Sequence, residues 1–227
     1  MNDRHSVIDS ITGAFVPIHP DGRKFVFGAA GVTLLLFWLS SPLGWLGVIA
    51  TAYCAYFFRD PERVTPKRAG LVVSAADGRI TGVGKVPPAA ELGLASATTT
   101  RISVFLSVLD VHIVRAPVGG KLVRTNYVPG KFLNAELDKA SEENERLALV
   151  IETPAGEKIG LVLIAGLIAR RIVTFVKEGD SVEAGQRVGL IRFGSRADVY
   201  LPDGAVPIVE TGQIAIGGET VLAELKR

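Results

Sequence analysis

The chain has 227 residues, of which 48% are hydrophobic, a mean hydropathy of +0.34 and a formal net charge of +2. This length suffices for one full-sized domain and a smaller segment, and the hydropathy is higher than in an ordinary soluble enzyme, which indicates contact with a lipid bilayer. The small net charge, without a long basic run, argues against a nucleic-acid partner, and the single cysteine, Cys54, excludes disulfide scaffolds, CxxC redox motifs and cysteine-ligated zinc.

The first predicted element is a pair of apolar arms at residues 25–39 and 45–58. Neither arm contains a charged residue, and the sequence Ser-Ser-Pro-Leu-Gly at 40–44 divides them. At about 1.5 Å per residue each helical arm is about 20 Å long, which suits either a full span that recruits flanking residues or a shallow re-entrant hairpin. A buried helical hairpin of a soluble core is the alternative. The late start and the two arms are unlike a secretory signal peptide.

Positive charges flank the two arms and are absent from the turn between them. The flanking residues are Arg23, Lys24, Arg59, Arg63, Lys67 and Arg68. The positive-inside rule therefore predicts a protein held at the cytoplasmic face of the inner (cell) membrane. We expect four regions: an N-terminal tail at 1–22, a membrane-associated helical hairpin at 23–58, a basic linker at 59–70 and a β-rich domain at 71–227.

The β-rich domain is predicted from short apolar or alternating runs punctuated by Gly and Pro. Residues 147–153 and 158–165 read as two strands of a hairpin, joined by Pro-Ala-Gly-Glu at 154–157. Residues 133–146 are polar and are expected to form a helix or a loop.

Two further segments, 116–130 and 174–186, share a Val followed within three residues by a turn Gly. This pattern is loosely that of the small flattened barrels that carry lipoyl or biotinyl groups. The predicted fold class is therefore mainly β: a flattened lipoyl/biotinyl-like β barrel (a barrel-sandwich hybrid) preceded by an N-terminal hydrophobic helical hairpin.

The sequence Phe193-Gly194-Ser195 lies between two predicted strands, 187–192 and 196–201. The second run alternates polar and apolar residues, which is typical of a half-buried strand. Gly194 and Ser195 are therefore predicted at a hairpin tip, where Gly tolerates unusual dihedrals and a Ser hydroxyl can reach the carbonyl carbon on its N-terminal side. A Gly-Ser pair between strands is by itself typical of an ordinary turn.

Few side chains are available for acid/base chemistry. Of the three histidines, His5 and His19 lie in the N-terminal tail, which leaves His112. His112 is therefore the candidate acid/base, and the alternative is a half-buried histidine bonded to a backbone carbonyl. Asp77 precedes Gly78, and Asp-Gly is the usual composition of a turn. Asp110 is a competing carboxylate because it lies only two residues from His112. On a strand, however, those two residues would share a face without necessarily touching.

Taken together these features resemble the phosphatidylserine decarboxylases, most closely the short proenzymes of the bacterial and archaeal type. The resemblance covers essentially the whole chain and rests on the apolar hairpin and four motifs: Ala76-Asp77-Gly78, Asp110-Val-His112, Asn144-Glu-Arg146 and Phe193-Gly194-Ser195. It implies a membrane-bound carboxy-lyase of phospholipid biosynthesis that converts phosphatidylserine to phosphatidylethanolamine and CO2.

The resemblance also implies that the chain cuts itself between Gly194 and Ser195. Ser195 would attack the Gly194 carbonyl, an N-to-O acyl shift would give an ester, and β-elimination would separate a β chain (1–194) from an α chain (195–227). Residue 195 would become a covalent pyruvoyl cofactor, which forms a Schiff base with the substrate amine and acts as the electron sink. The two chains would remain together as a heterodimer, with any higher oligomer left open.

The resemblance assigns His112 as the acid/base and Asp77 as the carboxylate that orients it. Longer members of the family carry a second histidine three residues after the first, where this chain has Arg115. In those relatives the second histidine completes the self-cleaving triad and the first serves decarboxylation. The division of labour here is therefore open: His112 does both jobs, or the neighbouring geometry has changed.

The implied substrate carries an anionic head group. Arg170 and Arg171 are candidates for contacts with its phosphate, with a solvated or membrane-facing basic patch as the alternative. The sequence contains no signature that calls for a metal or a nucleotide. Two other functions stay open: the same chemistry on an archaeal-type ether lipid, and a noncatalytic membrane-anchored adaptor of the lipoyl type, for which Lys139 in Leu-Asp-Lys-Ala would be the modified residue.

Overall fold

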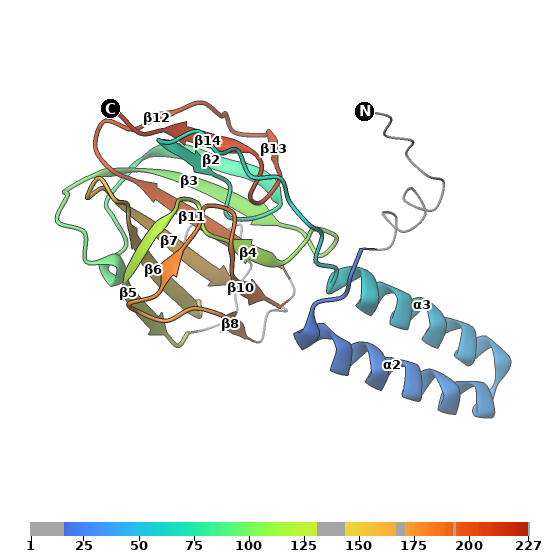
Figure 1. The fold of residues 1–227 in the computed structure, drawn as a ribbon. Coiled ribbons are helices and arrows are strands. Elements are labelled where there is room, and N and C mark those ends of the chain that lie inside the picture. Colours follow the sequence, from blue (N-terminus) through green and yellow to red (C-terminus); the bar gives the residue numbers. More distant parts are fainter. Residues whose placement is uncertain (1–15, 131–143, 167–170, 193, 227) are drawn as a thin grey trace, which may run out of the picture. The chain divides into compact units, whose positions relative to one another are not determined.

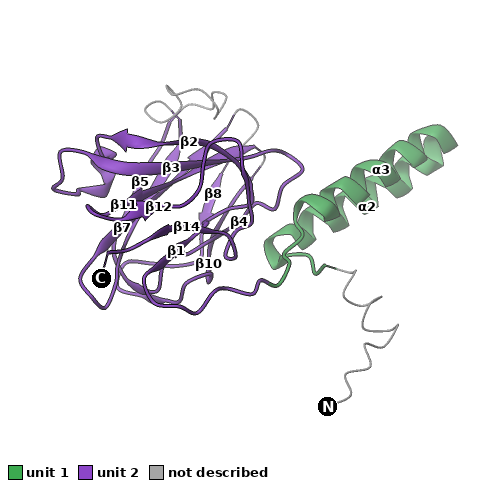
Figure 2. Cartoon of the chain, turned by 90° about the horizontal axis from the view of Figure 1, so that it is seen from above, with its two compact units in different colours: residues 1–62 green, residues 63–227 purple. Residues whose placement is uncertain are grey.

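The computed structural model describes residues 16–130, 144–166, 171–192 and 194–226. The chain divides into two compact units, Met1–Glu62 and Arg63–Arg227 (Figure 2). The first contains the helices and the second contains the sheets (Figure 1).

Two helices, α2 (Pro20–Leu39) and α3 (Ser41–Phe57), form the described part of the first unit. Both begin with a proline in the first turn, where the missing N–H costs nothing. Ser40 alone connects them, since its N–H donates to the Leu36 carbonyl and its hydroxyl accepts from Leu43 N–H. The turn is therefore shorter than the predicted five residues, and α2 is five residues longer than the predicted arm. Its 20 residues span about 30 Å.

The helices touch each other through small and polar residues. Gly44 packs against the Phe37 ring, Gly47 against Thr33, and the hydroxyls of Thr33 and Thr51 are 2.9 Å apart. Large apolar side chains point away from the pair, including Trp38, which is 85% exposed, and Phe27, which is 74% exposed. Among the described residues, only the helix Pro20–Leu39 is both long and apolar enough to cross a membrane.

The described residues of the second unit form fourteen strands and one short 3₁₀ helix. The strands are β1 (Leu71–Val73), β2 (Gly78–Val86), β3 (Thr99–Leu106), β4 (Ile113–Arg115), β5 (Gly120–Val128), β6 (Arg146–Glu152), β7 (Lys158–Ala165), β8 (Ile172–Thr174), β9 (Ser181–Val182), β10 (Arg187–Ile191), β11 (Ser195–Leu201), β12 (Val206–Pro207), β13 (Ile214–Ala215) and β14 (Val221–Glu224), and the 3₁₀ helix is η1 (Ala90–Leu92). The eight-stranded sheet has the order β13-β2-β3-β11-β7-β6-β5-β9, and two three-stranded sheets have the orders β4-β10-β8 and β1-β14-β12. The eight-stranded sheet curls into a half barrel, so the predicted mainly β, barrel-like class is confirmed (Figure 1).

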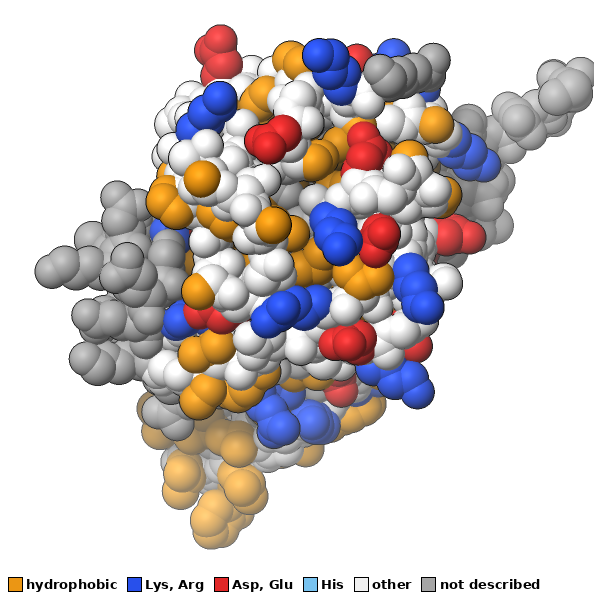
Figure 3. All heavy atoms as spheres, turned by 90° about the vertical axis from the view of Figure 1, so that its left-hand side faces the viewer, with side chains coloured by type: hydrophobic (Ala, Val, Ile, Leu, Met, Phe, Trp, Pro, Cys, Tyr) orange, Lys and Arg blue, Asp and Glu red, His pale blue; other side chains and the backbone are white. Residues whose placement is uncertain are grey.

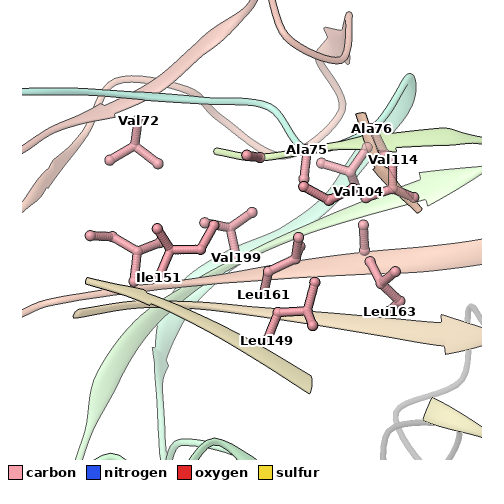
Figure 4. Close-up of a cluster of buried hydrophobic side chains, with 14 of the residues drawn as sticks. Val72, Ala75, Ala76, Val104, Val114, Leu149, Ile151, Leu161, Leu163 and Val199 are labelled. Atoms are coloured by element: carbon pink, nitrogen blue, oxygen red, sulfur yellow. The ribbon is translucent and has the colours of Figure 1, made fainter. Parts of the chain in front are cut away.

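The main core lies inside the curl. Alternate residues of neighbouring strands meet there, as Figure 4 shows for Leu149, Leu161, Leu163 and Val199. All four are completely buried. A second, smaller cluster lies on the other face of the sheet, where Leu92 of η1 covers β6 and β7. The central strands are therefore apolar on both faces.

On the surface, acidic and basic side chains are interspersed, as on the face shown in Figure 3.

The hairpin predicted around residues 154–157 is confirmed, because β6 pairs with β7 from Arg146↔Ile164 to Glu152↔Lys158. The two similar segments of the sequence pair with each other, through β5 and β9.

The hairpin predicted at Gly194-Ser195 is wrong. Strand β10 pairs with β4 and β8, whereas β11 pairs with β3 and β7, so the chain turns a corner between two sheets at this point. The prediction of a half-buried β11 is also wrong, since all seven of its residues are buried. Its polar residues Arg196 and Asp198 are buried because they pair with each other, through Nε–Oδ1 at 2.9 Å and Nη2–Oδ2 at 3.0 Å.

Candidate active site

Ser195 opens the central strand β11, between Leu106 of β3 and Ala165 of β7. Its side chain is 0% exposed, and its Oγ has no hydrogen-bond partner among the described residues. Leaving a buried hydroxyl unpaired costs about 1–3 kcal/mol. The site therefore holds a buried hydroxyl whose hydrogen and lone pairs are available to a reacting group.

Gly194 enters this strand with φ at +61°, in the left-handed region. A Cβ built there would meet only Val108 Cγ1, at 3.9 Å. Glycine is required here by the backbone conformation rather than by lack of space, since an L-residue pays about 1–2 kcal/mol in this region. The Gly194 N–H donates to Nε2 of His112 at 3.1 Å.

His112 is completely buried at the start of β4, next to the corner. Because Nε2 accepts from Gly194, the ring hydrogen lies on Nδ1, which donates to the Asp110 carbonyl at 3.0 Å. The His112 carbonyl accepts from Ile191 N–H at 3.2 Å, which fastens the histidine to the end of β10. A neutral imidazole with its Nε2 lone pair turned toward Gly194 thus lies one peptide from the Gly194–Ser195 bond.

The two candidate carboxylates have different surroundings. The Asp110 Oδ2 accepts from Ser107 N–H at 2.7 Å and closes the turn before His112, so Asp110 orients the ring through its backbone carbonyl. Asp77 forms an ion pair with Arg63, between Oδ2 and Nη2 at 2.6 Å, and its Oδ1 accepts from Gly217 N–H at 2.8 Å. The sequence analysis placed Arg63 only among the basic residues of the linker. Nothing in the sequence indicates that it contacts Asp77, 14 positions away.

Arg115, three residues after His112, is 5% exposed. Its Nη1 donates to the Gly185 carbonyl at 2.9 Å, and its side chain lies against Gly218. Arg171 is exposed, and its carbonyl accepts from Arg192 N–H at 3.3 Å, so it borders the chain that leads to Ser195. Arg170, Lys139 and Phe193 lie outside the described residues.

The Asn144-Glu-Arg motif has a positioning geometry that the sequence did not reveal. Asn144 Nδ2 donates to the Ala165 carbonyl at 2.7 Å, and the Glu145 carbonyl accepts from Ala165 N–H at 2.9 Å. Glu145 also accepts from Ile172 N–H through its carboxylate, at 3.0 Å. Since Ala165 is the residue opposite Ser195, the motif fixes the strand against which Ser195 lies.

Comparisons with known proteins match most of the chain. Residues 50–223 match the family described as phosphatidylserine decarboxylase. The chain is also 57% identical over 218 residues to a protein of Nitrobacter winogradskyi named phosphatidylserine decarboxylase proenzyme, a match that covers 96% of this chain and 88% of the relative.

Proposed function

Because this chain belongs to the phosphatidylserine decarboxylase family, a family of carboxy-lyases, we propose that it cuts itself at Gly194–Ser195 and then decarboxylates phosphatidylserine to phosphatidylethanolamine. The observation that carries the proposal is the buried, unpartnered Ser195 hydroxyl beside a glycine in the left-handed region and a neutral histidine. A noncatalytic barrel would have no use for this combination.

The first step uses only the chain's own atoms. Ser195 Oγ attacks the Gly194 carbonyl carbon while a base takes the hydroxyl proton, the C–N bond breaks and a C–O bond forms, and the proton passes to the new amine. His112 Nε2 is the base in this proposal. It moves from the Gly194 N–H to the Ser195 hydroxyl, because catalytic hydrogen bonds tighten only in the reacting state.

The ester then breaks by β-elimination. A base removes the Ser195 Cα proton, the Cβ–O bond breaks, and Gly194 leaves as the carboxylate end of the β chain. One water hydrolyses the remaining enamine and releases ammonia, which leaves a ketone at residue 195. The buried position of residue 195, between β3 and β7, fits a group that must be protected from bulk water.

The ketone of such a pyruvoyl group supplies the electron sink for the carbanion left when CO2 departs. His112, already at this corner, would hold the proton that the product carbon needs. Arg171 would bind the phosphate of the head group, because a guanidinium matches phosphate oxygens and this residue borders the same corner. The apolar helices would hold the enzyme at the cytoplasmic face of the membrane.

Intact-mass measurement of the purified protein tests the proposal. We expect two chains. The mass of the C-terminal fragment should be that of residues 195–227 with a free serine, less the mass of one ammonia molecule. Ser195→Ala should stay as one inactive chain. Ser103→Ala is the matched control, because Ser103 also has a buried, unpartnered hydroxyl, on the neighbouring strand β3. Full activity in an uncut chain would overturn the proposal.

A further inference from the structure

Ser195 lies at one edge of the eight-stranded sheet, which we call the Ser195 edge. Just inside this edge a single row of paired residues crosses the sheet. The row consists of Ile214 of β13, Arg79 of β2, Phe105 of β3, Arg196 of β11, Ile164 of β7, Arg146 of β6 and Val128 of β5. Because the row is continuous, segments that are far apart in the sequence meet at the Ser195 edge.

Exposed hydrophobic side chains gather at this edge. Five of the eight exposed large hydrophobic residues in the described part of the second unit belong to it. They are Val108 and Leu109 after β3, Tyr127 on β5, and Ile214 and Ile216 at β13. A single exposed hydrophobic residue is normal on a protein surface, whereas a group around one site indicates an interaction surface.

The turn that follows β3 carries two of these side chains. Its backbone is fixed, since Ser107 N–H donates to Oδ2 of Asp110 at 2.7 Å and Leu109 N–H donates to Oγ of Ser107 at 3.3 Å. A Cβ built at Gly194 would lie 3.9 Å from Cγ1 of Val108, so the turn borders the bond that is proposed to be cut. Turn residues are ordinarily small or polar, and a Val-Leu pair here therefore indicates contact with an apolar phase.

A lipid bilayer fits this edge better than a second protein chain does. The head group of a phospholipid substrate has to reach residue 195, which is buried between β3 and β7, while its acyl chains stay in an apolar phase. The edge also carries the exposed residues Tyr127 and Arg171, and aromatic and basic residues beside hydrophobic ones are typical of a membrane interface. A protein chain bound there would instead close the approach to residue 195.

We propose that the Ser195 edge lies against the lipid bilayer, with the side chains of Leu109 and Ile214 among the acyl chains. The phospholipid then reaches residue 195 without leaving the membrane. This inference rests on the lipid substrate of the proposed function. It goes beyond anchoring by the helices, because it assigns a membrane-contacting surface to the second unit itself.

Site-directed spin labelling of the full chain in vesicles of phosphatidylcholine and phosphatidylglycerol tests the proposal. Cys54, the only cysteine, is first changed to alanine, and a nitroxide is then attached to Leu109→Cys or, separately, to Ile214→Cys. Val206→Cys is the matched control, because Val206 is 59% exposed and Leu109 is 57% exposed. Val206 follows the far end of β11, whose six steps of about 3.3 Å place that end about 20 Å from Ser195.

Power saturation measures how often each label collides with oxygen, which dissolves in lipid, and with a polar nickel chelate, which stays in water. We expect the labels at positions 109 and 214 to collide with the nickel chelate about 10-fold less often than the label at position 206, since polar solutes are excluded from hydrocarbon. Their collisions with oxygen should be more frequent than those of the control. Two independent positions at the edge keep the test valid if one substitution disturbs its own turn.

Equal exposure of all three labels to the nickel chelate would overturn the inference. So would exclusion of both reagents from positions 109 and 214, which would indicate a second protein chain at this edge. The intact mass of the same labelled chains separates the two proposals. An edge in water on a chain that is cut at Ser195 overturns only the membrane contact, and an edge in lipid on an uncut, active chain overturns only the proposed self-cleavage.

Discussion

The buried Ser195 hydroxyl has no hydrogen-bond partner among the described residues. This lowers the stability of the fold, and an alanine at the same position would avoid the loss. The neighbouring residues reduce the freedom of that hydroxyl. Gly194 fixes the turn by its positive φ, Ala165 is held by Asn144, and His112 is held by the Asp110 carbonyl. Preorganisation of this kind lowers the entropy that a reaction must lose at its transition state.

His112→Ala should slow self-cleavage by about 10² to 10⁴, the range typical of a positioned acid/base. Any processed fraction should also turn over slowly, because in the proposed mechanism the product carbon takes a proton from the same ring. Gel analysis over hours measures cleavage, and turnover per mole of cleaved chain measures the second step. Complete processing of His112→Ala would assign the cleavage base to another residue.

Asp77→Asn keeps an acceptor for Gly217 N–H and removes the charge opposite Arg63. It should slow cleavage without abolishing it, since the base remains and only its surroundings change. Arg63→Gln is the matched variant, because it breaks the same ion pair from the other side. If Asp77 acts on the chemistry, its variant is slower than Arg63→Gln. Equal rates would reduce Asp77 to a structural partner of Arg63.

At the scale of the element, β11 contains a completely buried ion pair between Arg196 and Asp198. Asp198→Asn should destabilise the fold by about 3–5 kcal/mol, because it removes the buried negative charge that faces Arg196 and Arg101. Urea denaturation measures this change. Glu224→Gln is the control, since its exposed pair with Arg68 contributes about 0–1 kcal/mol. Similar losses in the two variants would contradict the prediction.

The same strand gives the molecule a sensitivity to alkali. Burial raises the pKa of the Tyr200 phenol above its ordinary value of 10.0, and the charge of Asp198 raises it further. Above about pH 10 the unfolded chain loses this proton while the folded chain keeps it, so the free energy of unfolding falls as the pH rises. Tyr200→Phe should flatten this fall in urea titrations at pH 9 to 11. An unchanged slope would contradict the assignment.

Some elements could be predicted from the sequence and others could not. The β6–β7 hairpin was predictable because a Pro-Ala-Gly-Glu turn separates two apolar runs, and the helical arms because they contain no charge. The corner before Ser195 was not, because a short connection between two strands does not encode which sheets they join. The ring-orienting carbonyl of Asp110 was also hidden, since a backbone acceptor has no signature in the side chains.

At the scale of the whole molecule, both buried hydrophobic clusters of the described residues lie in the second unit, and every buried hydrophobic residue of the main one lies at position 72 or later. A variant without residues 1–62 should therefore still fold and cut itself. Its activity on lipid vesicles should fall more than its activity on a dispersed short-chain substrate, if the helices supply proximity to the bilayer as proposed. Equal losses on both substrates would contradict an anchoring role. The variant without residues 59–62 alone is the control for shortening the chain.

The place of β11 between β3 and β7 would determine how long an enzyme cut at the proposed position stays active. The fragment that begins at Ser195 supplies this central strand, and it also supplies β12, β13 and β14 to the edges and to a second sheet. If the chain cuts itself as proposed, the fragment therefore stays bound while the protein stays folded. Because the cut removes the covalent link that would keep the fragments at a high effective concentration, an unfolded molecule would have to recapture this strand from solution. Each cut molecule would then work until its first global unfolding, so its working life would follow the unfolding rate rather than the folding equilibrium.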